Sequence, residues 1–356
     1  MDYRAAIWVV TPKGRDIATA VAGGLPGSRI FRSSGLDTGD ASSGIFDKLS
    51  DAVAREFTRF NAHIFIMSIG IAVRMIGPLL DHKLKDPAVV AVDDAGRFAV
   101  SLLSGHVSGA NELAEKVAGI INAIPVITTA TDAAGLPAVD VTAREKGLFI
   151  QNPEVIKTVS MALLTHQRIA LIDPMGVFTN TEFAAHPLVD RHPHAGLGQE
   201  ILPPHAAVVV IDDGIGNTLA NTLVLRPPSL ALGIGCNRHT RAAEIRELMD
   251  GVMDKFRLAA ESLFCVASVD LKFDEPGLVE FAAELNLSLR FFSKDQLNAV
   301  TAIQNPSAMA EKHIGVKSVC EAAAILAAAN GQLIVPKHKS TNATLAVARM
   351  PCSSSV

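Results

Sequence analysis

The amino-acid sequence predicts an α/β protein with three parts: a mostly parallel N-terminal α/β domain, a less regular middle α/β region and a separate C-terminal α/β domain. Three observations indicate this class. Hydrophobic residues make up 49% of the chain but aromatic residues make up 5%, so aliphatic side chains dominate, as they do in buried parallel strands. Strand-like and helix-like segments alternate at both ends of the chain. The length of 356 residues also exceeds what one ordinary hydrophobic core contains.

The N-terminal domain is expected over residues 1–144. Apolar residues recur at helical spacing in three stretches, which predict helices that begin at Ile17 and that cover residues 45–60 and 110–121. Short runs of aliphatic residues around these helices predict strands at 6–10, 63–67, 88–92, 98–102 and 125–127. This alternation predicts a mostly parallel sheet that is covered by helices.

The middle region is expected over residues 145–228, where the alternation is weaker. Its strand-like runs are 169–172, 208–211 and 222–225. The proline pair at 227–228 predicts a boundary, because two prolines stiffen the chain and end regular structure. The C-terminal domain is expected over 229–350, with strands at 230–234, 264–269, 288–292, 332–335 and 345–348 and a helix over 319–329. We expect residues 351–356 to form a disordered tail.

Several functional classes are excluded by composition. No apolar stretch reaches the roughly 20 residues that a membrane-spanning helix needs. The chain starts with a strand-like segment and carries no leader-like pattern, so we expect a cytoplasmic location. The net charge of −4 and the absence of a basic run argue against nucleic-acid binding. The cysteines form no CxxC pair, which predicts reduced thiols at Cys236, Cys265, Cys320 and Cys352.

The densest group of polar residues lies between positions 89 and 112. Two strands joined at Asp94-Ala95-Gly96 are expected to bring Ser104-Gly105-His106 to the edge of the sheet, just before a helix. Glycine lets the backbone approach a ligand closely, and the start of a helix favours negative charge. A histidine at this place could act as a general base or acid. Asn111 and Glu112, in the first helical turn, could orient a water molecule or the imidazole.

A structural interpretation of the same residues stays open. Ser108 could cap the helix, Glu112 could support its dipole, and His106 could make a structural hydrogen bond. The run from Asp93 to Gly96 is also what a tight hairpin requires.

Two further elements of the N-terminal domain could contact a ligand. Gly70 and Arg74 follow a predicted strand, and Arg74 could bind a carboxylate or form a surface salt bridge. Thr129 and Asp132 follow another strand, where they could line a site or cap a turn. Neither element continues into a phosphate-binding loop, so nucleotide binding is disfavoured.

The C-terminal domain offers cations and one candidate nucleophile. Lys272, Lys337 and Lys339 suit an anionic ligand, although solvated loops would suit them as well. Cys236 could be a nucleophile, but a small half-buried thiol is the favoured interpretation. The histidines of the middle region lie in a proline-rich stretch that does not favour a metal site, and they are His186, His192, His194 and His205.

Together these residues resemble the cobalt-precorrin-5A hydrolase family, often called CbiG, of anaerobic cobalamin biosynthesis. The N-terminal stretches that carry the resemblance are Ser68–Arg74, Lys85–Asp93, Leu102–His106, Gly109–Leu113 and Pro125–Asp132. The C-terminal stretches are Gly233–Cys236, Ser318–Ala324 and Asn342–Arg349, while the middle matches loosely. Two positions depart from the usual pattern. Ser108 stands in place of a glycine, and Asn237 stands in place of a basic residue, which leaves position 237 without an assigned role.

The resemblance implies a contracted-ring cobalt tetrapyrrole as substrate, with its ring A acetate closed as a δ-lactone onto the extruded carbon. Water opens the lactone, acetaldehyde leaves, and cobalt-precorrin-5B forms. The cobalt ion belongs to the substrate, so the resemblance implies no cofactor and no metal site in the protein. Neighbouring enzymes of the cobalamin pathway are the expected further partners.

The resemblance also implies roles for individual residues. It favours His106 as the base, the helix start at residues 109–111 as oxyanion donor, and Glu112 or Asp93 as the group that orients the base. The substrate carries several carboxylates, and the candidate binding residues are Gly70, Arg74, Gly105, Gly109, Asn111, Thr129, Asp132, Arg238, Lys272, Lys337 and Lys339. Two alternatives remain open: a protein that carries or channels corrinoid intermediates without turnover, and a different hydrolase with Cys236 as nucleophile.

Overall fold

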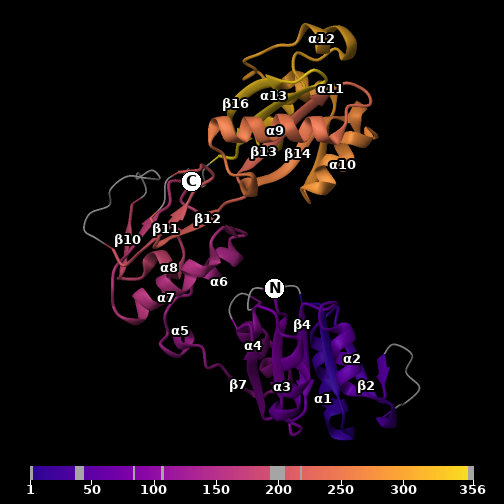
Figure 1. Cartoon of the computed structure of the whole chain (residues 1–356), viewed down its shortest axis with the longest axis vertical. Coiled ribbons are helices and arrows are strands. Elements are labelled where there is room, and N and C mark those ends of the chain that lie inside the picture. Colours follow the sequence, from indigo (N-terminus) through magenta and orange to yellow (C-terminus); the bar gives the residue numbers. More distant parts are fainter. Residues whose placement is uncertain are drawn as a thin grey trace. The chain divides into compact units, whose positions relative to one another are not determined.

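The computed structural model of the chain describes residues 3–36, 44–82, 85–105, 108–192, 205–216 and 219–351 (Figure 1). The chain divides into two compact units, Met1–Val141 and Thr142–Val356. The first unit contains one sheet and the second contains two, and helices pack on all of them. The predicted α/β class is therefore confirmed. His106, His194 and residues 352–356 of the predicted tail lie outside the described residues.

The first unit is built on a seven-stranded sheet with the order β3-β2-β1-β4-β5-β6-β7. Its strands are β1 (Ala5–Val9), β2 (Arg29–Ser33), β3 (Gly44–Phe46), β4 (Ala62–Ile66), β5 (Ala88–Val92), β6 (Phe98–Leu103) and β7 (Ile124–Val126). The first five strands are parallel to one another, β6 is antiparallel to β5, and β7 is parallel to β6. The predicted mostly parallel sheet is confirmed.

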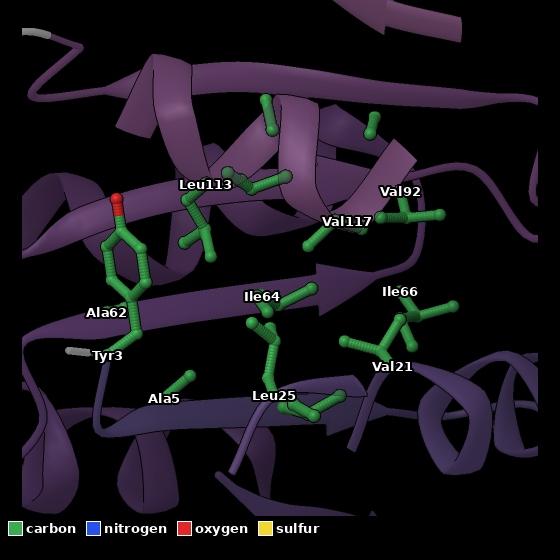
Figure 2. Packing of buried hydrophobic residues seen from close by; sticks show 14 of the residues in the cluster. Tyr3, Ala5, Val21, Leu25, Ala62, Ile64, Ile66, Val92, Leu113 and Val117 are labelled. Carbon is green, nitrogen blue, oxygen red and sulfur yellow. The ribbon is translucent and has the colours of Figure 1, made fainter. Parts of the chain in front are cut away.

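Helices cover both faces of this sheet, which explains why its central strands are buried along their whole length. One face packs against α1 (Pro12–Gly24) and α4 (Ala110–Ile121), and Figure 2 shows Leu113 and Val117 of α4 above Ile64 of β4. The other face packs against α2 (Leu49–Glu56) and α3 (Ile69–Ile76). The remaining helical segments of this unit are η1 (Ser34–Leu36), η2 (Gly77–Leu79) and α5 (Ala130–Ala133), and α6 (Val139–Glu145) spans the boundary between the two units.

One predicted helix is wrong in its first part. Residues 45–60 were expected to form one helix, but Ile45 and Phe46 belong to the edge strand β3, and α2 begins at Leu49. Phe46 is buried and Ile45 is exposed, so the two side chains alternate as they do in a strand. Two adjacent apolar residues are compatible with the period of a helix and with that of a strand. The spacing therefore did not show that Ile45 and Phe46 belong to a separate strand.

The middle sheet, in the second unit, has the order β10-β9-β11-β12-β8. Its strands are β8 (Phe149–Ile150), β9 (Ile169–Ile172), β10 (Val189–Arg191), β11 (Ala207–Ile211) and β12 (Thr222–Arg226). All are parallel except β8, which pairs antiparallel with β12. Its helical segments are η3 (Pro153–Val155), α7 (Ile156–Leu164) and α8 (Glu182–Ala185).

The C-terminal sheet has the order β15-β14-β13-β17-β16. Its strands are β13 (Leu230–Cys236), β14 (Leu263–Val269), β15 (Ser288–Phe292), β16 (Gln332–Lys339) and β17 (Ala343–Arg349). The predicted pairing of the last two strands is confirmed. One face packs against α9 (Ala242–Phe256) and α10 (Pro276–Glu284), and the other packs against α11 (Lys294–Ala299), α12 (Ala308–Ile314) and α13 (Cys320–Ala327). Two short helical segments, η4 (Ala260–Ser262) and η5 (Asp270–Lys272), flank β14.

A buried ion pair joins the two sheets of the second unit. Arg349, at the end of β17, donates to both carboxylate oxygens of the fully buried Asp213, at 2.6 and 2.8 Å. The hydroxyl of Ser229 donates to the same carboxylate at 2.6 Å. A buried carboxylate needs such partners, so this contact holds the start of β13 beside the end of β11. No helix in the described parts of the chain has the length and hydropathy that would let it cross a membrane.

Candidate active site

The candidate site lies where β6 ends and α4 begins. Ser104 has a left-handed backbone, with φ of 58°, and this turns the chain away from the sheet. The backbone N–H groups of Ala110 and Asn111 donate to the carbonyl oxygens of Ser104 and Gly105, at 3.1 and 3.0 Å. The turn at 104–105 is thereby bound to the first turn of α4. His106, the predicted base, lies outside the described residues, so its role remains a prediction.

Asn111 is the centre of a buried polar network at this place. Its side-chain oxygen accepts a hydrogen bond from Ser101 at 2.6 Å, and its side-chain nitrogen donates to Thr129 at 2.7 Å and to Asp132 at 3.1 Å. A Cβ atom on Gly105 would lie 2.7 Å from the Asn111 oxygen, so a larger residue there would have to displace the Asn111 side chain. The structure therefore brings together four of the predicted site residues: Gly105, Asn111, Thr129 and Asp132.

The N-terminus of α4 is fixed by hydrogen bonds other than a side-chain cap. Gly109 is the N-cap residue with φ of 79°, and no side chain caps the helix. The Tyr3 hydroxyl donates to the carbonyl of Gly109 at 2.8 Å, and the Ser108 hydroxyl donates to the carbonyl of Asp86 at 2.7 Å. The interpretation of Ser108 as the cap is therefore wrong. Ser108 instead fixes the segment that leads into β5.

The predicted oxyanion donors need a correction as well. Two of the backbone N–H groups in the stretch 109–111, those of Ala110 and Asn111, already donate to Ser104 and Gly105. A donor that is engaged in this way is not available to a developing negative charge. The prediction is therefore wrong for these two groups. The Ser104 hydroxyl is a different candidate, because it is buried and has no partner among the described residues.

Glu112 lies beside the same turn, and its surroundings stabilise the ionised form of its side chain. Burial alone would raise its pKa, but the Lys116 ammonium, 2.8 Å from one oxygen, lowers the pKa below its usual value overall. An ionised carboxylate in the first turn of a helix also favours the helix dipole. Its predicted role in orienting a base remains a prediction.

Asp93 lies at the opposite end of β6 from Ser104. Its backbone N–H pairs with Phe98 at the start of β6, whereas Ser104 follows the end of that strand. Six residues of strand separate the two ends by about 20 Å, so Asp93 is not the group that orients a base beside Gly105. The Asp93 carboxylate accepts from the backbone of Arg97 and Phe98 at 2.7 Å each, which closes the hairpin. The hairpin interpretation of this residue is confirmed.

Gly70 and Arg74 lie on α3, which begins at the carboxyl end of β4 and packs on the sheet face opposite to α4. Arg74 folds back over Gly70 and donates to its carbonyl oxygen at 2.9 Å. The predicted surface salt bridge is not observed, since Arg74 forms no ion pair within the described ranges. These two residues therefore do not join the Asn111 network.

Three of the four predicted cations of the C-terminal domain have partners within it. Arg238 pairs with Asp274 at 2.8 Å, and Lys272 pairs with the fully buried Glu275 at 3.2 Å. Lys337 donates through its ammonium group to two backbone carbonyls at 2.9 and 3.2 Å. Lys339 ends β16, where its backbone pairs with that of Thr344 across the hairpin. Their predicted contacts with a substrate remain predictions.

Three family models match consecutive parts of the chain. They are described as Cobalamin synthesis G N-terminal over residues 51–132, Cobalamin biosynthesis central region over 137–227, and Cobalamin synthesis G C-terminus over 230–348. A curated protein of Priestia megaterium, named cobalt-precorrin-5A hydrolase, is 33% identical to this chain and covers 98% of it, with 95% of the relative covered in turn.

This chain belongs to the cobalt-precorrin-5A hydrolase family.

A second curated member of the family, the cobalt-precorrin-5A hydrolase of Salmonella typhimurium, is 31% identical over 92% of this chain and 93% of its own length. Among solved structures, a cobalamin biosynthesis protein G homolog from Sulfolobus solfataricus is 22% identical. The alignment covers 97% of this chain and 96% of that one, with a TM-score of 0.37. The predicted resemblance to the cobalt-precorrin-5A hydrolase family is confirmed.

In this member of the cobalt-precorrin-5A hydrolase family, Cys236 does not have the properties of a nucleophile. Burial raises the pKa of the Cys236 thiol to about 11, although Lys272 and Arg238 nearby act in the other direction. A nucleophilic cysteine needs a lowered pKa, because the thiolate is the reactive form. Among the residues that the structure describes, no three His, Cys, Asp or Glu side chains are grouped as metal ligands would be.

The sequence prediction missed two residues that fix the start of α4. Ser101 was treated as part of a strand, and Tyr3 as part of the start of the chain, yet both fix the start of α4. A signal was present for Ser101, because a hydroxyl among the apolar residues of a partly buried strand usually has a hydrogen-bond partner. No local pattern predicts the contact of Tyr3, which lies 106 residues before Gly109.

Proposed function

We propose that this chain catalyses the hydrolysis of cobalt-precorrin-5A, in which the ring A δ-lactone opens and acetaldehyde is released to give cobalt-precorrin-5B. The similarity to two curated cobalt-precorrin-5A hydrolases over more than nine-tenths of the chain carries this proposal. The Asn111 network supports a location for the chemistry, since it fixes the residues on both sides of His106.

The reaction needs a base for the attacking water, a donor for the oxyanion and a proton transfer while the carbon–carbon bond breaks. We assign His106 as the base and Glu112 as the carboxylate that orients it. The Ser104 hydroxyl takes the place of the amides of Ala110 and Asn111 as oxyanion donor, because it is the neighbouring donor without a partner in the described chain. The cobalt ion enters as part of the substrate, so no metal held by the protein is required.

The decisive experiment is anaerobic incubation of the purified chain with cobalt-precorrin-5A. Acetaldehyde is measured by its reduction with alcohol dehydrogenase and NADH, and the corrinoid product is identified by its mass. We expect one acetaldehyde for each cobalt-precorrin-5A consumed. Under the assignment of His106, a His106→Ala variant still binds the corrinoid but releases acetaldehyde at a rate at least about 100-fold lower.

Two results would contradict the proposal in different ways. A wild-type chain that binds the corrinoid without releasing acetaldehyde would be a carrier. If the wild type is active and His106→Ala keeps the full rate, the proposed function stands but the assignment of His106 as the base is wrong. A Ser104→Ala variant tests the oxyanion donor separately, with an expected loss in kcat of about tenfold or more and little change in KM.

A further inference from the structure

The proposed reaction needs a second acid–base group beside the assigned base. Once water has opened the lactone, the extruded carbon carries a hydroxyl group, and the bond from this carbon to the macrocycle still has to break. The hydroxyl proton must leave in this step, because the carbon–oxygen double bond of acetaldehyde forms from that O–H group. The roles given to His106, Glu112 and Ser104 do not include this proton transfer. A group that takes the proton has to lie close to the turn at Ser104 and Gly105.

The sheet brings the ends of two strands together at this turn. β6 and β7 are parallel neighbours, with Val100 opposite Val126. The carboxyl end of β6 leads into Ser104, and the carboxyl end of β7 leads, at the same edge, into the segment with Thr129 and Asp132. In α/β sheets, ligands bind outside the carboxyl ends of parallel strands. The fold therefore places Asp132 beside the candidate active site.

The position of the Asp132 carboxylate is fixed through Asn111. The side-chain nitrogen of Asn111 donates to one Asp132 oxygen at 3.1 Å, and it lies 3.2 Å from the point that a Cβ atom of Gly105 would occupy. The carboxylate is thus within two hydrogen-bond lengths of that point. Asn111 is buried, whereas Asp132 is exposed. The amide anchors the carboxylate from the interior, and the carboxylate lies on the side that a substrate can reach.

Glu112, the other carboxylate near this turn, is less suited to the proton transfer. The Lys116 ammonium lies 2.8 Å from one of its oxygens. A carboxylate that is paired with an ammonium group is a weaker proton acceptor, because protonation removes the charge that the ion pair stabilises. The Asn111 amide that anchors Asp132 is neutral and opposes protonation less. Glu112 therefore suits a charged, orienting role.

We infer that Asp132 is the acid–base group of the step in which acetaldehyde leaves. Its carboxylate takes the proton from the hydroxyl of the extruded carbon, and the carbon–oxygen double bond of acetaldehyde forms. The bond from the extruded carbon to the macrocycle breaks, its electron pair passes into the conjugated ring, and the ring takes the proton back from Asp132. The step consumes no other reactant. The inference rests on the proposed function, because the substrate and the two steps come from there.

The test follows substrate, intermediate and product by mass in the anaerobic reaction with cobalt-precorrin-5A. The full-length Asp132→Asn variant should open the lactone but release acetaldehyde at least about 100-fold more slowly, with little change in KM. A corrinoid heavier than the substrate by one water should therefore accumulate. A loss of folding alone would not produce this species. His106→Ala, in contrast, should leave the lactone closed.

Three further variants separate the chemical role from a structural one. Thr129→Val removes the other hydrogen bond of the Asn111 nitrogen, so it should lower the melting temperature, but each substrate it consumes should still yield one acetaldehyde. Asp16→Asn is the matched control, because Asp16 is an exposed aspartate on α1, and it should behave like the wild type. If circular dichroism shows that Asp132→Asn is unfolded, Asp132→Ala replaces it, and added formate should restore acetaldehyde release by supplying the missing carboxylate.

Three results would overturn the inference. A folded Asp132→Asn variant that releases acetaldehyde at the wild-type rate would show that another group takes the proton. A folded variant that is slow but returns the substrate with its lactone closed would place Asp132 in the first step. A folded Asp132→Ala variant that is slow and does not respond to formate would leave Asp132 with a structural role only.

These results differ from a failure of the proposed function. A wild type that releases no acetaldehyde contradicts the function, and the inference falls with it. An active wild type beside an equally active Asp132→Asn variant contradicts the inference alone.

Discussion

The side-chain nitrogen of Asn111 lies 2.7 Å from the hydroxyl oxygen of Thr129, and this hydrogen bond joins the first turn of α4 to the loop after β7. The same amide accepts from Ser101 on β6, so one residue links three segments of the first unit. Because Asn111 is buried, each of these bonds replaces a bond to water. The position of the turn at Ser104 and Gly105 depends on this residue.

Replacing Asn111 with alanine should lower both stability and activity. The variant leaves the buried groups of Ser101 and Thr129 without their partner, which costs about 1–3 kcal/mol in the free energy of unfolding. Urea unfolding followed by the fluorescence of Trp8 measures this cost, because the only tryptophan of the chain lies in the core of the first unit. A variant as stable as the wild type would contradict a structural role for the network.

Gly105→Ala should disturb the site while leaving α4 intact. The added Cβ would lie 2.7 Å from the oxygen of the Asn111 amide, and three hydrogen bonds hold that amide in place. We therefore expect a cost of about 1–3 kcal/mol in the free energy of unfolding and a loss of acetaldehyde release. Gly119→Ala, on the exposed side of α4, is the matched control. No atom lies within 4 Å of its added Cβ, and it should stabilise the helix by about 0.5–1 kcal/mol. Equal effects of the two substitutions would argue against the close contact.

The first unit should lose stability as the pH falls from about 6.5 to about 4. Burial lowers the pKa of His63 to about 4, even though its ring bonds to the Phe57 carbonyl. The unfolded chain takes up a proton near pH 6.5, whereas the folded chain takes it up near pH 4, so protons favour the unfolded state between these values. Over this pH range the free energy of unfolding should fall by about 3 kcal/mol.

The fluorescence of Trp8 is also the measurement for His63, since the indole N–H of Trp8 donates to His63 at 3.0 Å. Urea unfolding at a series of pH values should show the decline in the wild type. A His63→Gln variant should be less stable at pH 7 but should lose most of the dependence on pH in this window. A variant with the same slope as the wild type would assign the dependence to other groups.

Cys236 should react slowly with alkylating reagents. Its pKa of about 11 makes the thiolate fraction at pH 8 roughly 100-fold or more below that of an ordinary cysteine. The rate of iodoacetamide modification, located by mass spectrometry in a Cys352→Ser background, should rise steadily as the pH approaches 11. Modification near the rate of free cysteine at pH 8, together with loss of acetaldehyde release, would restore Cys236 as a candidate nucleophile.

The elements of the site were predictable, and their arrangement was less so. The strands at 88–92 and 98–102, the turn at Asp94-Ala95-Gly96 and the helix from Ala110 follow from patterning and turn chemistry, and all are observed. Gly96 has φ of 66°, which glycine adopts without strain. The error concerned Asp93, because the predicted hairpin already implied that its two strands run in opposite directions and that Ser104 lies far from the turn.

The partners of buried polar groups were the other part that patterning did not provide. The hydrogen bonds of Asn111 reach residues 10, 18 and 21 positions away along the chain, and their geometry depends on the order of β5, β6 and β7. The local spacing of residue types identifies a strand or the start of a helix, but it does not determine which strands lie next to each other in the sheet. The structure was therefore needed to separate the Asn111 network from Arg74 and Asp93.

The place of β17 in the C-terminal sheet has a consequence for synthesis in the cell. This strand lies between β13 and β16 and pairs with both, although it is formed by residues 343–349. Residues 343–349 are synthesised well after Leu230–Cys236, so β13 lacks this neighbour until the chain has grown by about another 100 residues. The first unit draws all its strands from the first 126 residues and can fold long before that moment. The seven-stranded sheet can therefore form while the C-terminal sheet still lacks one of its inner strands, and during that interval β13 presents an unpaired edge.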